Sequence, residues 1–427
     1  MSPKSLLLLA LALALIAAAF LLSERDPRPT VRDEAPEDKR AATAQAFGGE
    51  TEAPAGREQD ALDGLFETLG QAYRRGDRET IAASYDFEMT VALLEELGLF
   101  PDVLRERREE VVRDAGSMLA ERLAASGPSE AWDEHEIVHV DDLVAGQEVI
   151  AYVRHRDTVN GETMRTRWWL SRRSGRWRVY DYEVLEMGSR MAVLLGLGFV
   201  MAEADSGQDA YLPLLSAAQQ HLMMGQLTTA RALLERLQES EAELPEVLRS
   251  MVWTLLAILH SEEGRHGEAL EAAGRVDYGP ADRPLLYLVR AQSHNALGQP
   301  GAALEEALRY VELLGPDDEI LAEIGAAHLA LGQREEGLAK LREGLELEPG
   351  SVRCLAVLAA ALGAAGVEEL AGHLGAFRDP PVALRELIYD PRFEQDPTGA
   401  RALIEAGRRL GFDPAYLGAL EAQVDRE

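Results

Sequence analysis

The chain has 427 residues, enough for two or three domains, and 47% of them are apolar, which excludes global disorder. It carries 43 Lys and Arg against 74 Asp and Glu, and the formal net charge of −31 repels phosphate backbones, so no nucleic-acid partner is expected. The single cysteine, Cys354, excludes an intrachain disulfide and any multi-cysteine metal site.

The N-terminus contains a strongly apolar segment. Residues 6–22 are seventeen consecutive apolar residues, which predicts a membrane helix within residues 1–22. The alternative is a cleaved signal peptide that ends at the alanines 17–19. We expect a single-pass anchor, because the apolar run continues past those alanines. The soluble part is then expected outside the cytoplasm, or, after cleavage, as a secreted or periplasmic protein.

Residues 23–59 are rich in proline and mixed charges, which predicts a disordered linker. Residues 60–205 then read as helices followed by strands. Turn residues stand between the later strands, at Asn160-Gly161 and Ser174-Gly175. This order predicts an α+β domain with one curved antiparallel sheet. The predicted elements are a helix from residue 62, a helix at 103–123, and strands at 136–140, 148–156, 164–172 and 176–185.

The last two strands have faces of different character. Strand alternation places Trp168, Leu170 and Val179 on an apolar face. The other face carries a basic patch, which is expected to be either a solvated face paired with the chain's own carboxylates or a docking face for an anionic partner. We define this patch by Arg165, Arg167, Arg176 and Arg178.

A family resemblance arises at these strands. The run RWWLSRRSGRWRVYDYEVLE resembles the terminal hairpin of nuclear-transport-factor-2-like (cystatin-like) domains, and is similar to periplasmic phospholipid-shuttle proteins of the toluene-tolerance type. The resemblance implies a cone that encloses an apolar ligand, serves as an interaction module or hosts isomerase-type catalysis. Asp181, expected on the apolar face, would act as an acid or base or satisfy backbone donors.

The sequence H-E-x-x-H occurs at residues 135–139. On a helix, His135 and His139 would share one face and could bind zinc, with Glu203 as a third ligand. That pattern resembles exported zinc peptidases with tetratricopeptide repeats. On a strand, however, the two histidines would lie about 13 Å apart, too far for one metal ion. The β-branched residues between them favour the strand, so no metal or other cofactor is expected.

The second half of the chain repeats itself. Gly264, Gly298, Gly332 and Gly366 are spaced by 34 residues, and Gly225 stands one longer step earlier. Small residues recur seven positions before and five positions after each glycine, where two helices of a hairpin approach closely. They are Ala218, Ala257, Ala291, Gly325 and Ala359 before it, and Ala230, Ala269, Ala303, Gly337 and Ala371 after it.

This pattern resembles the tetratricopeptide repeat, and AEIGAAHLALGQREEGLAKLREGLELEPGS is a close copy. The resemblance implies about five repeats over residues 211–376, stacked into an all-α right-handed solenoid with a concave groove. Residues 377–427 are expected to form a helical cap. A histidine recurs at one position of four repeats, and a packing role is expected because stacked positions lie too far apart for one metal ion. These histidines are His221, His260, His294 and His328.

The family geometry also implies which residues line the groove. The predicted groove residues are mostly apolar with a few amides, and they lack the Lys and Arg that grip a terminal carboxylate. Such a surface suits an amphipathic helix, from a partner or from this chain. The predicted groove residues are Leu215, Gln219, Met251, Thr254, Ile258, Leu285, Leu288, Gln292 and Asn295.

The expected function is therefore a membrane-anchored or exported scaffold that mediates protein–protein interaction, with binding favoured over catalysis. Two alternatives stay open. In the first, the α+β domain carries an apolar or lipid ligand. In the second, the chain is a zinc peptidase.

Overall fold

The computed structural model describes residues 55–100, 102–126, 132, 134–156, 163–185, 189–193, 195–196, 211–240, 244, 246–276, 283–390 and 392–425. The described part is mixed α+β, mostly helical with one small open antiparallel sheet. The chain divides into two compact units, residues 1–216 and 217–427. The predicted membrane helix lies outside the described residues, and so does the predicted linker except for its last five residues, which are helical.

The first unit begins with helices that are stopped and capped by local signals. The helices are α3 (Ala55–Arg75), α4 (Arg78–Ser84), α5 (Phe87–Glu96), the 3-10 helix η1 (Asp102–Arg107) and α6 (Arg108–Ser126). Asp77 caps α4 by accepting a hydrogen bond from the Thr80 amide (3.1 Å), and Asp86 caps α5 by accepting one from the Met89 amide (3.1 Å). These caps fix the two corners of the chain before and after α4.

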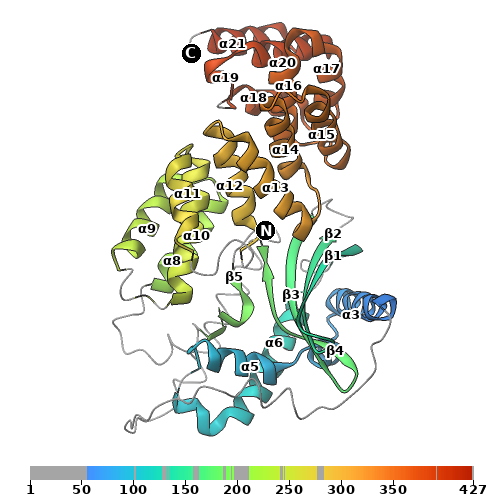
Figure 1. The fold of residues 1–427 in the computed structure, drawn as a ribbon, viewed down its shortest axis with the longest axis vertical. Helices are drawn as coiled ribbons and strands as arrows, with labels where there is room; N and C mark the ends of the chain where they lie inside the picture. Colours follow the sequence, from blue (N-terminus) through green and yellow to red (C-terminus); the bar gives the residue numbers. More distant parts are fainter. Residues whose placement is uncertain are drawn as a thin grey trace. The chain divides into compact units, whose positions relative to one another are not determined.

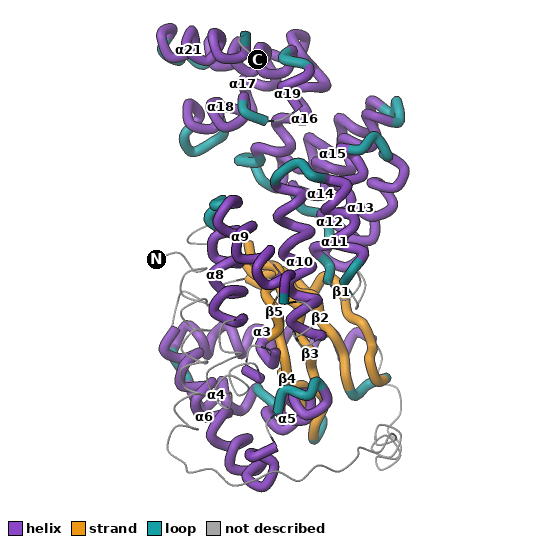
Figure 2. Tube along the Cα trace, turned by 90° about the vertical axis from the view of Figure 1, so that its left-hand side faces the viewer, coloured by secondary structure: helices purple, strands orange, loops and turns teal. Residues whose placement is uncertain are grey.

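The strands that follow form a simple meander. They are β1 (Glu134–Val144), β2 (Glu148–Arg156), β3 (Thr163–Arg173), β4 (Arg176–Val184) and the two-residue β5 (Ser189–Arg190). They pair antiparallel in chain order (Figure 2). Ser174 and Gly175 have φ of 52° and 75°, the positive values that a two-residue hairpin requires, so this predicted turn is confirmed. The predicted turn at Asn160-Gly161 lies outside the described residues.

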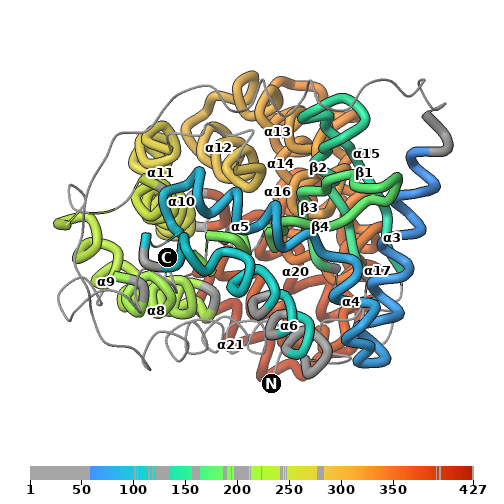
Figure 3. The backbone as a smooth tube through the Cα atoms, turned by 90° about the horizontal axis from the view of Figure 1, so that it is seen from below, coloured from blue at the N-terminus to red at the C-terminus, as the bar shows by residue number. Residues whose placement is uncertain are grey.

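The core of the first unit lies between α3 and one face of the sheet (Figure 3). Helix α3 contributes Leu62, Phe66 and Leu69 at helical spacing, and strands β2 and β3 contribute the residues of their apolar face. The strand residues buried there include Val149, Ala151, Val153, Trp168 and Leu170. The apolar face predicted for β3 is therefore confirmed.

Register shifts in β1 and β4 change which residues share a face. In β1, His135 pairs with His155 and His139 pairs with Tyr152, so one residue of β1 is left over between them. In β4, Val179 pairs with Leu170 and Asp181 pairs with Trp169, which leaves Tyr180 unpaired in the ladder.

The bulge at Tyr180 overturns one prediction. Because paired residues of an antiparallel sheet point to the same side, Asp181 lies on the same face as Trp169, opposite the core. Tyr182 pairs with Trp168 instead, and their rings stack on the core side with centroids 5.0 Å apart. The placement of Asp181 on the apolar face was therefore wrong.

The remaining helices form successive hairpins (Figure 1). Helices α14 and α15 pack together, as do α12 and α13 and also α10 and α11, and α10, α12, α14 and α16 pack in sequence on one another. The helices are α8 (Tyr211–Met223), α9 (Leu227–Glu239), α10 (Glu246–Glu262), α11 (His266–Gly274), α12 (Leu285–Ala296), α13 (Pro300–Leu314), α14 (Asp318–Ala330), α15 (Arg334–Leu347), α16 (Val352–Leu362) and α17 (Val367–Gly375).

The C-terminal region is helical, as predicted. It consists of α18 (Pro380–Ile388), α19 (Arg392–Gln395), α20 (Thr398–Arg409) and α21 (Pro414–Val424). Helix α20 packs on α16 and α17, so the last helices share one apolar core with the end of the hairpin array. Among the described residues, Val352–Gly375 is long and apolar enough to cross a membrane by length and composition, and 56% of its apolar window is buried. Its place in this shared core accounts for its apolar composition.

Candidate functional site

The turns of the helix hairpins are closely alike. Gly225, Gly264, Gly298 and Gly332 have φ between 69° and 78°, a conformation that favours glycine. The amide after each glycine donates to the carbonyl of the histidine four residues before that glycine, at 2.8 or 2.9 Å. The predicted turn role of these four glycines is confirmed.

The fifth hairpin departs from this rule. Helix α16 ends at Leu362, and Gly363 takes the positive φ of 52°. Gly366 has φ of −99° and precedes α17 at the end of the short 3-10 helix η6 (Gly363–Gly366). The predicted equivalence of Gly366 with the other turn glycines was therefore wrong, because the chain turns three residues earlier.

The side chains of the recurring histidines form contacts across the turns. The Nδ1 atom of His221 lies 2.5 Å from Oε1 of Gln226, and His328 makes the same contact with Gln333 at 2.5 Å. His294 bonds Gln299 in the same way at 2.7 Å. In the second hairpin Arg265 replaces the glutamine, and Nδ1 of His260 lies 3.6 Å from Glu268. Each histidine thus joins the end of one helix to the start of the next.

Small residues allow the helices of each hairpin to approach closely. The alanines at the predicted crossing positions of α10, α12 and α13, namely Ala257, Ala291 and Ala303, are fully buried. In the fourth hairpin both positions are glycine. A Cβ atom added to Gly337 would lie 2.9 Å from the carbonyl oxygen of Gly325 and 2.8 Å from Leu329. Helices α14 and α15 therefore cross with backbone against backbone.

The predicted groove residues differ in accessibility. Ile258, Leu285 and Asn295 are half-buried, and the other six are buried. Two of the amides form contacts between helices: Gln292 accepts a hydrogen bond from Ser261 (3.1 Å), and Asn295 donates to the carbonyl of Glu323 (2.9 Å). The accessible part of the predicted groove is therefore limited to the half-buried residues of α10 and α12.

One charged residue in the helical unit was not singled out from the sequence. Glu323 is only 2% exposed, and its carboxylate accepts a hydrogen bond from Asn295 Nδ2 (2.8 Å). Arg353 and Arg392 lie 3.4 and 3.8 Å from the same carboxylate. This group joins α12, α14, α16 and α19. In the sequence, this buried group was indicated only by a single glutamate within the apolar run of α14.

The H-E-x-x-H sequence lies on β1, as the extended interpretation predicts. Because of the bulge, His135 points to the core side, where its Nε2 lies 3.4 Å from Asp63, and His139 points to the other side, 2.8 Å from Asp141. Glu203 lies outside the described residues. Among the residues that the structure describes, no group of three His, Cys, Asp or Glu side chains could hold a metal ion.

The four arginines of the basic patch do not have the same environment. Arg167 is 3% exposed and forms an ion pair with Glu183, which is 1% exposed, at 2.5 Å. Arg165 and Arg178 are half-buried, and Arg176 is exposed. Arg167 therefore belongs to the interior of the first unit, while Arg165, Arg176 and Arg178 remain accessible.

Asp181 is fully buried on the same face. Its carboxylate accepts hydrogen bonds from Arg190 Nε (2.6 Å), from the Ala192 amide (2.8 Å) and from the Tyr182 amide (3.0 Å). Burial raises the pKa of Asp181, against the opposing effect of the Arg190 charge. These bonds attach β5 and the residues after it to β4. This matches the backbone-satisfying alternative for Asp181.

The core side of the sheet contains a cluster of rings. The imidazole of His155 lies with its centroid 4.0 Å from Trp132, and its Nε2 accepts a hydrogen bond from Trp168 Nε1 (3.2 Å). Phe66 of α3 packs edge-on against His155 and Trp168, with centroids 6.1 and 5.5 Å away. These rings occupy the space between α3 and the sheet in which a carrier would enclose an apolar ligand.

Acidification below pH 6.5 is expected to weaken the first unit through His155. Burial, with a smaller effect of His135, lowers the pKa of His155 well below 6.5, whereas the unfolded chain binds a proton near that value. The unfolded state therefore holds more protons, and the free energy of unfolding falls by up to about 1.4 kcal/mol per pH unit. Urea unfolding at several pH values measures this slope. His155→Phe should remove it, and equal slopes in both chains would contradict the expectation.

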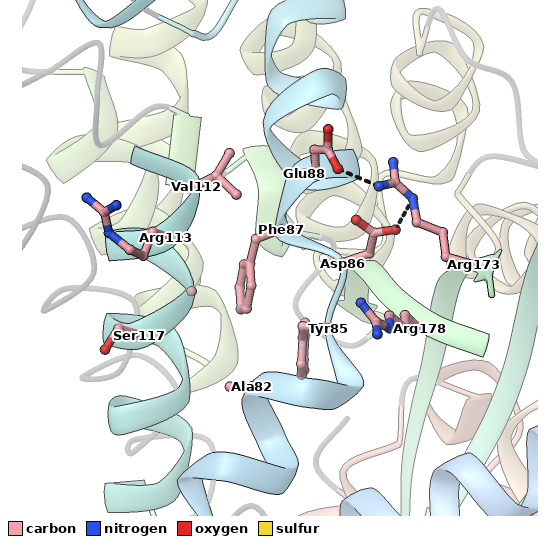
Figure 4. A pocket seen from close by; sticks show the side chains of 11 residues that line it. Ala82, Tyr85, Asp86, Phe87, Glu88, Val112, Arg113, Ser117, Arg173 and Arg178 are labelled. Atoms are coloured by element: carbon pink, nitrogen blue, oxygen red, sulfur yellow. Dashed lines mark hydrogen bonds and ion pairs between the residues drawn. The ribbon is translucent and has the colours of Figure 1, made fainter. Parts of the chain in front are cut away.

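A separate hollow of about 470 Å³ lies between the α4–α5 corner, α6 and β4 (Figure 4). The corner is fixed to the sheet because the Asp86 amide donates to the Val179 carbonyl (2.7 Å) and Ser171 donates to the Asp86 carboxylate (2.8 Å). The hollow is lined by Ala82, Tyr85, Asp86, Phe87, Glu88, Val112, Arg113, Gly116, Ser117, Arg173 and Arg178.

Comparison with models of known protein families finds no match for the chain. Comparison with curated proteins finds none either. The basis for proposing a function is therefore the geometry of the described residues.

Proposed function

We propose that the chain is an interaction scaffold, and that its helical half is an array of tetratricopeptide repeats that binds a protein partner. The observation that carries this proposal is the recurrence, one repeat apart, of the same turn: a left-handed glycine and a histidine that binds the start of the next helix. Arrays of this kind present extended surfaces that bind other proteins.

The proposed partner segment is an amphipathic helix that lies along α10 and α12. Ile258 and Leu285 are half-buried apolar residues on these helices, and Asn295 is a half-buried amide in the last turn of α12. Apolar anchors with a few amides suit such a helix better than a terminal carboxylate. In this proposal the α+β unit is a second interaction module, and the N-terminal apolar segment attaches the scaffold to a membrane with its soluble part outside the cytoplasm.

The other two hypotheses have less support. A zinc peptidase needs both histidines of the H-E-x-x-H sequence at one metal ion, but they point to opposite faces of the sheet. A carrier needs an apolar cavity beneath the sheet. That space is instead filled by side-chain rings that pack against one another, namely Phe66, Trp132, His155 and Trp168.

A pair of matched variants tests the scaffold. Leu285→Glu places a charge at the proposed contact on α12, and Leu308→Glu places the same charge on α13 at a leucine that is already 55% exposed. The full chain and both variants serve as bait in extracts, and each recovered protein is quantified. We expect Leu285→Glu to reduce recovery of a specific partner at least about tenfold, because a buried charge in an apolar contact is costly.

Thermal unfolding of the three chains establishes that the variants are folded. Leu308→Glu should recover the partner as well as the native chain does. Equal recovery by Leu285→Glu and the native chain would contradict the proposed contact. Failure of the native chain to retain any protein more strongly than the unfolded chain would contradict the scaffold itself.

A further inference from the structure

The hollow beside β4 has the size and lining of a small-molecule site. Its volume of about 470 Å³ falls within the range of roughly 300–1,000 Å³ that ligand sites occupy. It belongs entirely to the first unit, and its lining contains none of the four rings Phe66, Trp132, His155 and Trp168 and no residue of α10 or α12. The scaffold proposal leaves it without a role.

The carboxylates of the hollow are already occupied. Arg173 holds both of them, with Nε 2.8 Å from Asp86 and Nη1 2.5 Å from Glu88 (Figure 4). Asp86 also accepts hydrogen bonds from the Met89 amide (3.1 Å) and from Ser171 (2.8 Å). Arg173 therefore links the two acids, and this group of three carries a formal net charge of −1.

Arg178 is a second cation in the lining of the hollow. Its side chain is half-buried and forms no hydrogen bond or ion pair with the residues that the structure describes. Figure 4 shows it beside Tyr85 and Asp86, whereas Arg113 lies on the far side of α6 from Phe87. A partly buried guanidinium whose N–H donors are not bonded to a carboxylate is a favourable place for an anion, because it offers two parallel N–H donors.

Aromatic and small side chains make up the rest of the lining. The rings of Tyr85 and Phe87 stack with centroids 5.6 Å apart and an interplanar angle of 15°. Phe87 is also held against Gly116, where an added Cβ atom would lie only 2.7 Å from the ring. Ala82 and Val112 complete an apolar surface. A flat ring fits such a surface, since offset stacking of aromatic rings is favourable.

We propose that this hollow binds a small aromatic anion, with its charged group paired to Arg178 and its ring against Phe87. The guanidinium selects a carboxylate or sulfonate, and the aromatic lining selects a planar body. The α+β unit would thus bind this small ligand, and the helices would bind the protein partner, at separate sites.

Titration of the full chain with 2-naphthoate, followed by calorimetry, tests the proposal. The neutral 2-naphthamide has the same ring and lacks the charge, so it should bind at least about tenfold more weakly. Arg178→Gln should weaken 2-naphthoate by at least about tenfold. Arg176→Gln is the matched control, because it removes the same charge from an exposed position two residues earlier on the same strand.

The affinity of Arg176→Gln should stay within about twofold of the native chain. Phe87→Leu supplies a second readout, since it keeps the charge and should weaken 2-naphthoate and 2-naphthamide alike. Equal affinities of Arg178→Gln and Arg176→Gln would overturn the proposal. So would the absence of binding up to about 10 mM, or equal affinities for the anion and the amide.

Discussion

Glu183→Gln is expected to lower the free energy of unfolding of the first unit by about 3–5 kcal/mol. The carboxylate of Glu183 and the guanidinium of Arg167 are 1% and 3% exposed and lie 2.5 Å apart. The substitution leaves the arginine charge in the interior without its counter-charge. Breaking a buried ion pair costs far more than its net contribution, because the remaining charge has lost both its hydration and its counter-charge.

Urea unfolding followed by tryptophan fluorescence measures this effect, since Trp169 lies against Arg167 with the guanidinium 4.7 Å from the ring centroid. Glu88→Gln is the matched control: Glu88 also pairs with an arginine, Arg173, but is 56% exposed, so its loss should cost at most about 1 kcal/mol. The double variant Arg167→Met/Glu183→Leu should recover most of the stability. Similar costs for Glu183→Gln and Glu88→Gln would refute the expectation.

Gly337→Ala is expected to destabilise the helical unit by about 1–3 kcal/mol. The new methyl group would lie 2.9 Å from the Gly325 carbonyl oxygen and 2.8 Å from Leu329, so α14 and α15 must move apart. An alanine normally stabilises a helix relative to glycine by about 1 kcal/mol. A loss of stability on Gly337→Ala would therefore indicate that the two helices cross closely. Thermal unfolding measures this loss.

Gly301→Ala is the control for this change. Gly301 also lies near the start of a hairpin's second helix, two residues before Ala303, which is the residue that corresponds to Gly337, and no atom lies within 4 Å of an added Cβ. The same substitution there should be neutral or stabilising by up to about 1 kcal/mol. If Gly337→Ala were as well tolerated as Gly301→Ala, the backbone contact between α14 and α15 would not be close.

The strands of the first unit were largely predictable, because their signals are local, whereas the helices α4 and α5 were not among the predicted elements. The boundaries of β2 match the prediction residue for residue, and the turn at Ser174 and Gly175 follows from its two residues. The side of the sheet on which Asp181 lies was not predictable. It depends on a β-bulge at Tyr180, and no residue type in the sequence indicates this bulge.

The same limit applies to charges and to turns. Alternation placed Arg167 in an accessible patch, and its partner Glu183 could be assigned only once the register of β3 and β4 was known. In the repeats, the period correctly located four turn glycines. The period wrongly placed the fifth turn at Gly366, because the chain already turns at Gly363, which adopts a positive φ.

The buried and half-buried histidines also bear on tolerance to acid in both units. Burial lowers the pKa of His155 in the sheet, and it lowers the pKa of His260 and of His266 in the helical unit. In the folded chain each of these imidazoles therefore opposes protonation, whereas the unfolded chain binds protons more readily. In an acidifying environment both halves of the chain are therefore expected to lose stability.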